Sequence, residues 1–405
     1  MMKQWICFFL LMVVLAGCAT DSAPATQVSP TFETSETTAV PAPDPVMERS
    51  LASMGSNYRL QKVLEKIESG EEVAVGFIGG SITEGYDAPN GQNYAALVTQ
   101  YLDNTYSDGT GKVRCINAGL SGTPSMLGLI RADRELLAYK PDLIFIEFAV
   151  NDAQSFTDKQ AYEALIRKCL CQKWEPAVIL LYSVTDNGYT CQNEMALTAF
   201  YYDLPAVSVR DAIMPELEAG TMAWTDWSGD EVHPHGEGHL LYSRFIIHLI
   251  DTLRGQDPDD VYIMPEEPKF SRDWTQMREY GSADLPLVSM GDFSASAAHP
   301  NFRSSFSYRG GQDSTNAGLT FEVTGTTLFL VFKSTPSAAY GTAEILVDGE
   351  VVAHLNGYSP DAWNNPVTQL IYADREIGTH TITVRMQPGD EDKSFDLLAV
   401  GIVHA

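Results

Sequence analysis

The apolar run Val73–Ile78 predicts a strand that is buried on both faces, and it stops at Gly79, Gly80 and Ser81. Strands of this kind belong to parallel sheets that are covered by helices. Ser81 would then lie at the carboxyl end of its strand, which is the edge of an open α/β sheet where ligands bind. Because the two glycines lack Cβ atoms, the chain can turn sharply there and bring a substrate close to the Ser81 N–H group.

Strand and helix patterns alternate up to about residue 254. Further apolar runs predict strands at 113–117, 143–150, 177–182 and 206–209. Apolar stripes at helical spacing predict helices near 60–70, 93–103, 127–137, 159–169 and 238–253. This alternation predicts an α/β domain over 50–255, built on a doubly wound parallel sheet of five strands.

The pattern changes after Gly255. Residues 256–285 are rich in charges and prolines and are interpreted as a connecting segment. Residues 286–405 show short alternating runs at 319–323, 327–332, 343–347, 351–355, 367–371, 379–386 and 397–403. Asp348 and Gly349, between two of these runs, are a strong signal for a hairpin. The spacing predicts a second, all-β domain, either a β-sandwich or a jelly roll.

The first residues predict an export signal. Lys3 and the apolar stretch 5–15 precede Leu15-Ala16-Gly17-Cys18, which resembles a bacterial lipobox in which Cys18 is lipidated. The alternatives are an ordinary signal peptide or a short membrane anchor, although the stretch falls short of the roughly 20 residues that span a bilayer. Residues 19–49, rich in Ala, Thr, Ser and Pro, are expected to be a disordered tether. The protein is therefore expected outside the cytoplasm, anchored to the cell membrane through Cys18.

The charge narrows the range of partners. The chain of 405 residues has 53 acidic and 26 basic side chains and a formal net charge of −27. Nucleic acid and anionic membrane surfaces would be repelled at long range, so a neutral substrate fits better. The cysteines that remain after processing are expected to be buried thiols, with one disulfide left open: Cys115, Cys169, Cys171 and Cys191.

Three other stretches supply chemical partners for Ser81. The second strand ends in Asn117–Thr123, which contains Gly122, and the third in Phe148–Asp152, which contains Asn151. A glycine N–H and an asparagine amide can donate to an oxyanion that develops during attack on an acyl carbon. Asp230 and His233 lie three residues apart before the last predicted helix. Asp230 can hold Nδ1 of the His233 ring, which leaves Nε2 to take the proton from Ser81.

These four stretches together resemble the SGNH, or GDSL, hydrolase superfamily over about residues 70–254. The resemblance implies a flavodoxin-like sheet, the catalytic residues Ser81, Asp230 and His233, and an oxyanion hole formed by Ser81, Gly122 and Asn151. No cofactor is expected. One departure is Gly80, where many members have Asp beside the serine, and this puts the local turn geometry in doubt more than catalysis. The chain lacks the Gly-x-Ser-x-Gly elbow of α/β-hydrolases.

Two further groups of residues are open to interpretation. His233, His235 and His239 cluster as metal ligands would, but the His-Glu-x-x-His arrangement is absent, and no metal is expected. Trp224 and Trp227 precede Asp230 and are predicted to bind substrate by stacking on sugar rings; packing of the loop against the sheet is the alternative. Trp363, in a loop of the β-domain, presents the same two alternatives.

The favoured function is a serine esterase that removes acetyl groups from poly- or oligosaccharides outside the cell. An SGNH domain joined to a jelly-roll-like module at a surface resembles the layout of carbohydrate esterases. The alternatives are a lipase, lysophospholipase or thioesterase of the same superfamily, and an inactive glycan-binding lipoprotein. The loops expected around Ser81 are polar with interspersed aromatics, which suits hydroxyl groups and sugar faces better than a long acyl chain.

Overall fold

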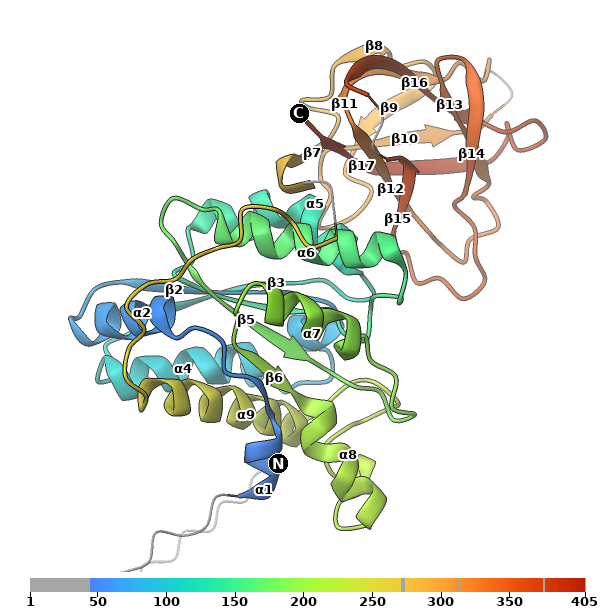
Figure 1. Ribbon diagram of the computed structural model, residues 1–405. Coiled ribbons are helices and arrows are strands. Elements are labelled where there is room, and N and C mark those ends of the chain that lie inside the picture. The colour runs from blue at the N-terminus through green and yellow to red at the C-terminus, as the bar shows by residue number, and fades with distance from the viewer. Residues whose placement is uncertain (1–43, 271–273, 312–313, 374–375, 405) are drawn as a thin grey trace, which may run out of the picture. The chain divides into compact units, whose positions relative to one another are not determined.

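The computed structural model describes residues 44–270, 274–311, 314–373 and 376–404 (Figure 1). The predicted signal peptide, the lipidation site Cys18 and most of the predicted tether lie outside the described residues. Among the described residues, no helix combines the length and the apolar character needed to cross a membrane.

A six-stranded sheet is the centre of the first domain, with the order β1-β6-β5-β4-β2-β3. Its parallel strands are β2 (Val73–Gly79), β3 (Val113–Gly119), β4 (Leu143–Glu147), β5 (Ala177–Tyr182) and β6 (Ala206–Ser208). These five have the flavodoxin-like order, so the predicted α/β fold is confirmed. The sixth strand, β1 (Leu51–Ser53), pairs antiparallel with β6 and corrects the expected number of strands. A strand of three residues is too short to show a readable alternation.

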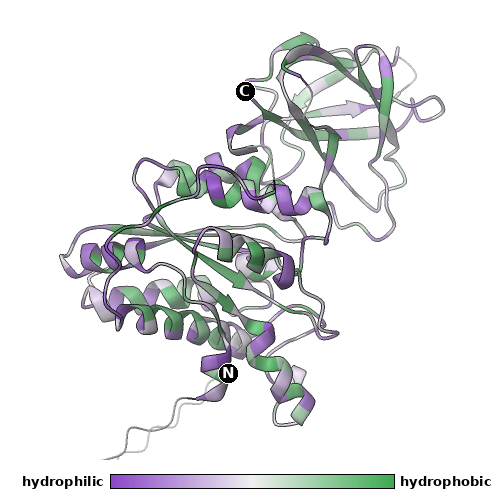
Figure 2. Ribbon diagram, viewed as in Figure 1, coloured by the Kyte–Doolittle hydropathy of each residue, from purple (hydrophilic) through white to green (hydrophobic). Residues whose placement is uncertain are grey.

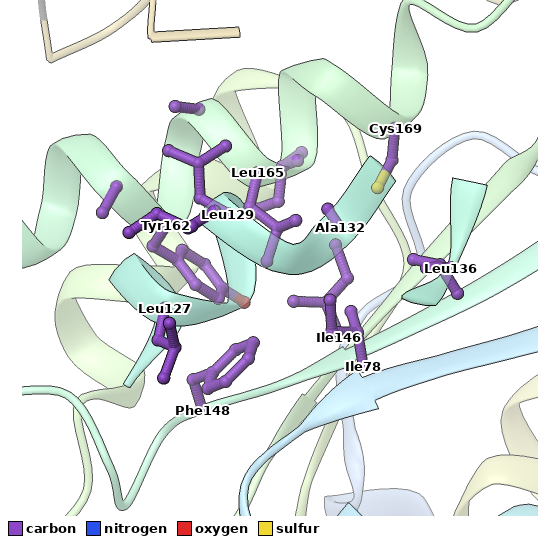
Figure 3. Packing of buried hydrophobic residues seen from close by; sticks show 14 of the residues in the cluster. Ile78, Leu127, Leu129, Ala132, Leu136, Ile146, Phe148, Tyr162, Leu165 and Cys169 are labelled. Atoms are coloured by element: carbon purple, nitrogen blue, oxygen red, sulfur yellow. The ribbon is translucent and has the colours of Figure 1, made fainter. Parts of the chain in front are cut away.

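Helices cover both faces of this sheet, with apolar sides inward and polar sides outward (Figure 2). One face carries α2 (Tyr58–Glu68), α4 (Tyr94–Tyr106), α8 (Val209–Ala219) and α9 (Gly236–Arg254). The other carries α5 (Ser125–Glu135), α6 (Phe156–Leu170) and α7 (Gln192–Tyr201). Figure 3 shows Leu129 of α5 and Leu165 of α6 packed over Ile146 of the sheet. The sequence pattern does not reveal α7, because Leu197 and Phe200 are exposed and break its apolar stripe.

The end of the predicted tether is ordered, which corrects the boundary at residue 49. Residues 45–49 form helix α1 (Pro45–Arg49), capped by Asp44, whose side chain accepts a hydrogen bond from the Val46 N–H. Arg49 reaches α8, where its guanidinium donates to the Ala212 carbonyl at 3.1 Å and pairs with Glu216 at 2.5 Å. Val46 and Met47 pack against the apolar core on that face of the sheet. These contacts outweigh the coil-forming composition of the segment.

The second domain is a β-sandwich, as predicted. One antiparallel sheet has the order β15-β12-β17-β10-β9, and the other has the order β14-β13-β16-β11-β8. The first contains β9 (Phe293–Ser296), β10 (Ser305–Arg309), β12 (Thr327–Lys333), β15 (Pro366–Tyr372) and β17 (Ser394–Val403). The second contains β8 (Leu287–Ser289), β11 (Leu319–Gly325), β13 (Thr342–Val347), β14 (Glu350–Asn356) and β16 (Gly378–Met386).

Inward-facing side chains of both sheets, such as Phe321 and Leu397, share one core. The predicted hairpin joins β13 to β14 through Asp348 at φ 53° and Gly349 at φ 86°. A two-residue hairpin turn whose twist matches that of its two strands requires positive φ at both positions. The prediction that this domain is a jelly roll stays a prediction.

The connecting segment also belongs to the sandwich, which corrects its boundary at residue 285. Within 256–285, β7 (Met277–Tyr280) pairs antiparallel with β17. The short 3-10 helix Trp274–Gln276 precedes it, and Trp274 and Met277 lie in the same apolar cluster as α5 and α6. Phe329 and Val331 of β12 complete that cluster from the sandwich side. The two domains therefore share an apolar core, and Arg134 adds two hydrogen bonds to Glu279 at 2.9 and 3.0 Å.

Candidate active site

Ser81 is the first residue of α3 (Ser81–Glu84), a single helical turn that follows β2 without a loop. Its residue surface is 5% exposed. β2 is hydrogen-bonded to β3 on one side and to β4 on the other, so the loops that follow these strands flank Ser81. β4 ends at Glu147, earlier than predicted, because the chain turns there: the Phe148 carbonyl accepts from the N–H groups of Asn151 and Asp152.

His233 connects Ser81 to Asp230 through both ring nitrogens. Its Nε2 lies 2.9 Å from Ser81 Oγ, and its Nδ1 lies 2.7 Å from Asp230 Oδ2. An ionised Asp230 holds the proton on Nδ1, which leaves Nε2 as an acceptor that faces the serine hydroxyl. The structure thus brings together the three residues that the sequence nominated, in the arrangement of a nucleophile, a base and an orienting acid.

Asp230 is fixed by its own turn. Its Oδ1 accepts the backbone N–H groups of Val232 at 2.8 Å and His233 at 2.7 Å. Partial burial raises the pKa of Asp230, but the hydrogen bonds from the His233 ring and from both backbone groups outweigh this and lower it overall. The carboxylate is therefore ionised at neutral pH, as an orienting acid must be.

The ring of Tyr86 packs against the ring of His233. Tyr86 was not singled out from the sequence. Its ring lies 4.4 Å from that of His233 between centroids, and the Tyr86 carbonyl lies 3.4 Å from His239 Nε2. Tyr86 comes just after Gly85, which closes α3 at φ 98°. A tyrosine after a serine turn matches no motif, so only the tertiary structure shows that Tyr86 packs against His233.

The two predicted oxyanion donors follow the strands on either side of β2. The loop with Gly122 is tied to the serine turn twice: the Leu120 N–H donates to the Gly79 carbonyl at 3.0 Å, and the Ser121 N–H donates to Glu84 Oε2 at 2.7 Å. Asn151 lies against Gly80, since a Cβ placed on Gly80 would be 2.7 Å from Asn151 Cγ. Both residues thus lie next to segments that adjoin Ser81.

Comparison with known proteins identifies the first domain. Residues 77–241 match the GDSL-like lipase/acylhydrolase family, and they contain the serine, the aspartate and the histidine described above. These residues form an SGNH hydrolase domain. The chain is an SGNH-type esterase. No curated protein sequence matches the chain significantly.

Both domains resemble a solved structure. Two crystal structures of a two-domain esterase (CEX) active on acetylated mannans, one of them with mannopentaose, each match with a TM-score of 0.80 at 27% identity. Each match covers 89% of this chain and 98% or 99% of the other chain. A variant of the acetylxylan esterase Axe2 from Geobacillus stearothermophilus matches 44% of this chain and 94% of its own at 21% identity, with a TM-score of 0.36.

The structure places Trp224 and Trp227 differently from the prediction that both stack on sugar rings. Trp227 is 2% exposed and packs among buried residues such as Tyr242, so its assignment as a sugar-stacking residue is wrong. Burial of the apolar indole ring in the core contributes more free energy of folding than a partly exposed position at the active site would. Trp224, in the 3-10 helix Trp224–Asp226, is partly buried against Trp227, and its Nε1 donates to the Asp230 carbonyl at 2.6 Å. Trp224 therefore supports the Asp230 turn, and its contact with substrate stays a prediction.

The three clustered histidines have different hydrogen-bond partners and do not converge on one point. His235 caps α9, where its Nδ1 accepts the Glu237 N–H at 3.2 Å. His239 is fully buried, and its Nδ1 accepts the Tyr94 N–H at 3.3 Å. In the part of the chain that the structure describes, no group of three or more His, Cys, Asp or Glu side chains is arranged to hold a metal. Of the cysteines, Cys115, Cys169 and Cys191 are free thiols; Cys115 and Cys171 are exposed, which corrects the expectation of burial for these two.

Two buried carboxyl groups, Glu147 and Asp152, lie in or next to the segments that carry the site residues, and no role could be assigned to them from the sequence. Glu147, the last residue of β4, is fully buried, and its Oε2 accepts from Thr83 Oγ1 at 3.2 Å. Burial raises the pKa of Glu147 to about 7. Asp152, which follows Asn151, is 3% exposed, and burial raises its pKa to about 8. An acid at the end of an apolar strand is the signal that could have marked Glu147.

Proposed function

We propose that this protein removes acetyl groups from poly- or oligosaccharides by a Ser-His-Asp mechanism with an acyl-enzyme intermediate. The observation that carries the proposal is the continuous hydrogen-bonded line from Asp230 through His233 to Ser81. A scaffold protein that only captures glycan has no need for this arrangement, which supports an enzyme over an inactive binding protein.

The chemistry follows from the three side chains. Ser81 Oγ attacks the ester carbonyl carbon while His233 Nε2 takes the hydroxyl proton, and the carbonyl oxygen becomes an oxyanion. The N–H groups of Ser81 and Gly122 and the Asn151 amide are its proposed donors. His233 then returns the proton to the sugar oxygen, which leaves as an alcohol and gives acetyl-Ser81. Water activated by His233 releases acetate and restores the serine.

A carbohydrate substrate is supported by the second domain. The chain shares both domains with the esterase active on acetylated mannans, so the likeness extends beyond the SGNH domain. Within this protein, the β-domain residue Trp363 lies over the oxyanion loop: a Cβ placed on Gly122 would be 2.5 Å from Trp363 Cζ2. Trp363 is 59% exposed. An exposed indole next to Gly122 offers a flat apolar face on which a sugar ring can stack.

The decisive experiment measures acetate release from acetylated polysaccharides, beginning with acetylated mannan and including acetylated xylan and pectin. We expect release by the wild-type protein and none by the Ser81→Ala variant. The same polymers after chemical deacetylation serve as blanks. If no acetylated polymer or oligosaccharide releases acetate while p-nitrophenyl acetate is hydrolysed, the carbohydrate assignment is wrong and the esterase acts on another alcohol.

Acyl length separates this proposal from a lipase, lysophospholipase or thioesterase. A long chain gains about 0.8 kcal/mol per buried CH₂ when a continuous apolar channel receives it. The residues around Ser81 instead include the charged Glu84, the polar Ser121 and the exposed Tyr86. We expect rates to fall steeply from acetyl to butyryl to octanoyl esters. An octanoyl ester hydrolysed as fast as the acetyl ester would place the lipase function first.

The proposed location is outside the cytoplasm, with the protein held at the membrane by a lipid on Cys18. Its support is the sequence Leu15-Ala16-Gly17-Cys18 after an apolar stretch. Fractionation of cells that produce wild-type and Cys18→Ala protein tests this. We expect the wild type in the membrane fraction and the variant unprocessed or released. Wild-type protein found in the cytoplasm would refute the proposal.

A further inference from the structure

The side chain of Asp152 connects the two loops that carry the proposed oxyanion donors. Its Oδ1 accepts the backbone N–H of Ser125 at 2.7 Å. Ser125 is the first residue of α5, three residues after Gly122, and the N-cap Pro124 has no side chain that can cap the helix. Asp152 therefore supplies, from the loop after β4, the cap that this helix end lacks. Asp152 itself directly follows Asn151.

The backbone of Asp152 is held from a third loop. Its carbonyl accepts the Tyr189 hydroxyl at 2.6 Å and the Cys191 thiol at 3.0 Å. The Cys191 N–H also donates to the Ala149 carbonyl at 2.7 Å. The turn 148–152 is thus fixed on one side by the segment 189–191 and on the other, through the Asp152 side chain, by α5.

Burial of the Asp152 carboxyl costs folding free energy, so we expect a function at this position to offset that cost. Asp152 is 3% exposed, and its burial outweighs the hydrogen bonds that it receives from the side chain and the backbone of Ser125, which lower its pKa. Burial of a carboxyl raises its pKa, here to about 8, so the group is largely protonated near pH 7. An apolar residue would avoid this cost but would leave the Ser125 N–H without its acceptor.

We infer that Asp152 is a positioning residue that sets the separation between the Gly122 N–H and the Asn151 amide. This inference rests on the proposed oxyanion role of those two groups. Asp152 acts through the loop ends that it joins rather than by contact with Ser81 or with substrate. Displacement of a catalytic group by about 1 Å can cost roughly 10²-fold in rate, so loss of this one hydrogen bond is expected to lower turnover.

The test is a double-mutant cycle on kcat with p-nitrophenyl acetate, a small ester whose hydrolysis needs no carbohydrate contact. We expect Asp152→Ala to lower kcat by about 10- to 100-fold with little change in KM. Asp152→Asn keeps an oxygen for the Ser125 N–H and should restore most of the activity. Because Asp152 acts through Asn151, Asp152→Ala combined with Asn151→Ala should lose at least about tenfold less than the product of the two single losses.

Two further variants keep the test decisive. Ser125→Pro removes the N–H at the other end of the bond, at a first helical position that accepts proline, and should reproduce the kcat loss of Asp152→Ala. Leu165→Ala, in the core of the same face, is the stability control, and it should lower the melting temperature while kcat is retained.

The inference fails if Asp152→Ala keeps wild-type kcat, if Asp152→Asn is as impaired as the alanine variant, or if the losses simply multiply. Failure of the carbohydrate proposal looks different, because it would appear as inactivity on acetylated glycans with the cycle on the small ester unaffected.

Discussion

Gly80 and Asn151 lie in contact, and a side chain at position 80 cannot share the space that Asn151 occupies. A Cβ built on Gly80 would overlap Asn151 Oδ1 and lie 2.7 and 2.9 Å from its Cγ and Nδ2. In this structure a side chain at position 80 would therefore have to displace the Asn151 amide.

We predict that Gly80→Ala lowers kcat by about 10²- to 10³-fold, the scale of one lost oxyanion donor, because it displaces the Asn151 amide. Steady-state kinetics with p-nitrophenyl acetate measure this. Gly311→Ala is the matched control, since nothing lies within 4 Å of a Cβ at that position. Wild-type kcat in the Gly80→Ala variant would show that Asn151 does not act from this place.

The proposed proton relay predicts an ordered set of losses. Ser81→Ala should abolish hydrolysis of p-nitrophenyl acetate with the fold intact, and His233→Ala should be nearly as severe, because no other base adjoins Ser81 Oγ among the described residues. Asn151→Ala should cost about 10²- to 10³-fold. Circular dichroism checks the fold, and labelling with a fluorophosphonate probe checks the nucleophile. Turnover at the wild-type rate in the Ser81 variant would overturn the site assignment.

Trp363 should affect glycan substrates more than small esters. We expect Trp363→Ala to lower kcat/KM on acetylated manno-oligosaccharides by about tenfold, equivalent to about 1.4 kcal/mol of lost stacking. The rate on p-nitrophenyl acetate should change little. Phe200→Ala removes an aromatic ring that is 85% exposed on α7 and serves as the control. An equal loss on both substrates would mean that Trp363 supports the Gly122 loop rather than a sugar.

The buried acid Glu147 predicts how stability depends on pH. Burial raises its pKa to about 7 in the folded protein, whereas an unfolded chain ionises it near the ordinary value of about 4.3. The stability that it contributes is therefore complete below about pH 4 and is lost as the pH rises to about 7. Over this window it lowers the free energy of unfolding by up to about 1.4 kcal/mol per pH unit.

We expect Glu147→Gln to remove this slope, so that the variant gains stability relative to wild type as the pH is raised from 4 to 8. Denaturant unfolding at several pH values measures the difference. Glu322→Gln, on the exposed side of β11, is the control and should leave the wild-type slope unchanged. A Glu147→Gln curve parallel to the wild-type curve would contradict the prediction.

Removal of the β-domain should impair folding as well as substrate capture. Phe329, Val331 and Leu398 share a buried cluster with α5 and α6. A chain cut before Pro286 would expose that apolar face. We expect low soluble yield and a lower melting temperature, with activity lost on small esters and polymers alike. A stable truncated protein with full activity on p-nitrophenyl acetate and reduced activity on polymer would instead assign the β-domain to substrate capture.

Local patterns were sufficient to predict most of the fold. Four parallel strands, β2, β4, β5 and β6, are apolar runs that are buried along their whole length, and this makes them visible in the sequence, whereas β3 at the edge of the sheet is largely exposed. The strands β11 and β16 alternate because one of their faces is exposed, whereas β12 and β17 are buried almost throughout because their sheet packs against α5 and α6 as well as against the sandwich core. The short β1, the exposed α7 and the helix α1 escaped because their stability comes from tertiary partners, such as the contact of Arg49 with α8.

The candidate site divides in the same way. The sequence by itself determined which residue types follow each strand, and parallel strands place those ends on one edge, so Ser81, Gly122 and Asn151 could be named together. Asp230 and His233 precede α9 and were added because of their spacing and the family resemblance. Only the tertiary structure decided which side chains are buried in the core and which lie at the active site. It buried Trp227, set Tyr86 against His233, brought Trp363 from a distant domain over Gly122 and enclosed Glu147 and Asp152. The physical reason is that burial depends on every element that packs around a position, and a local pattern contains information about its own element alone.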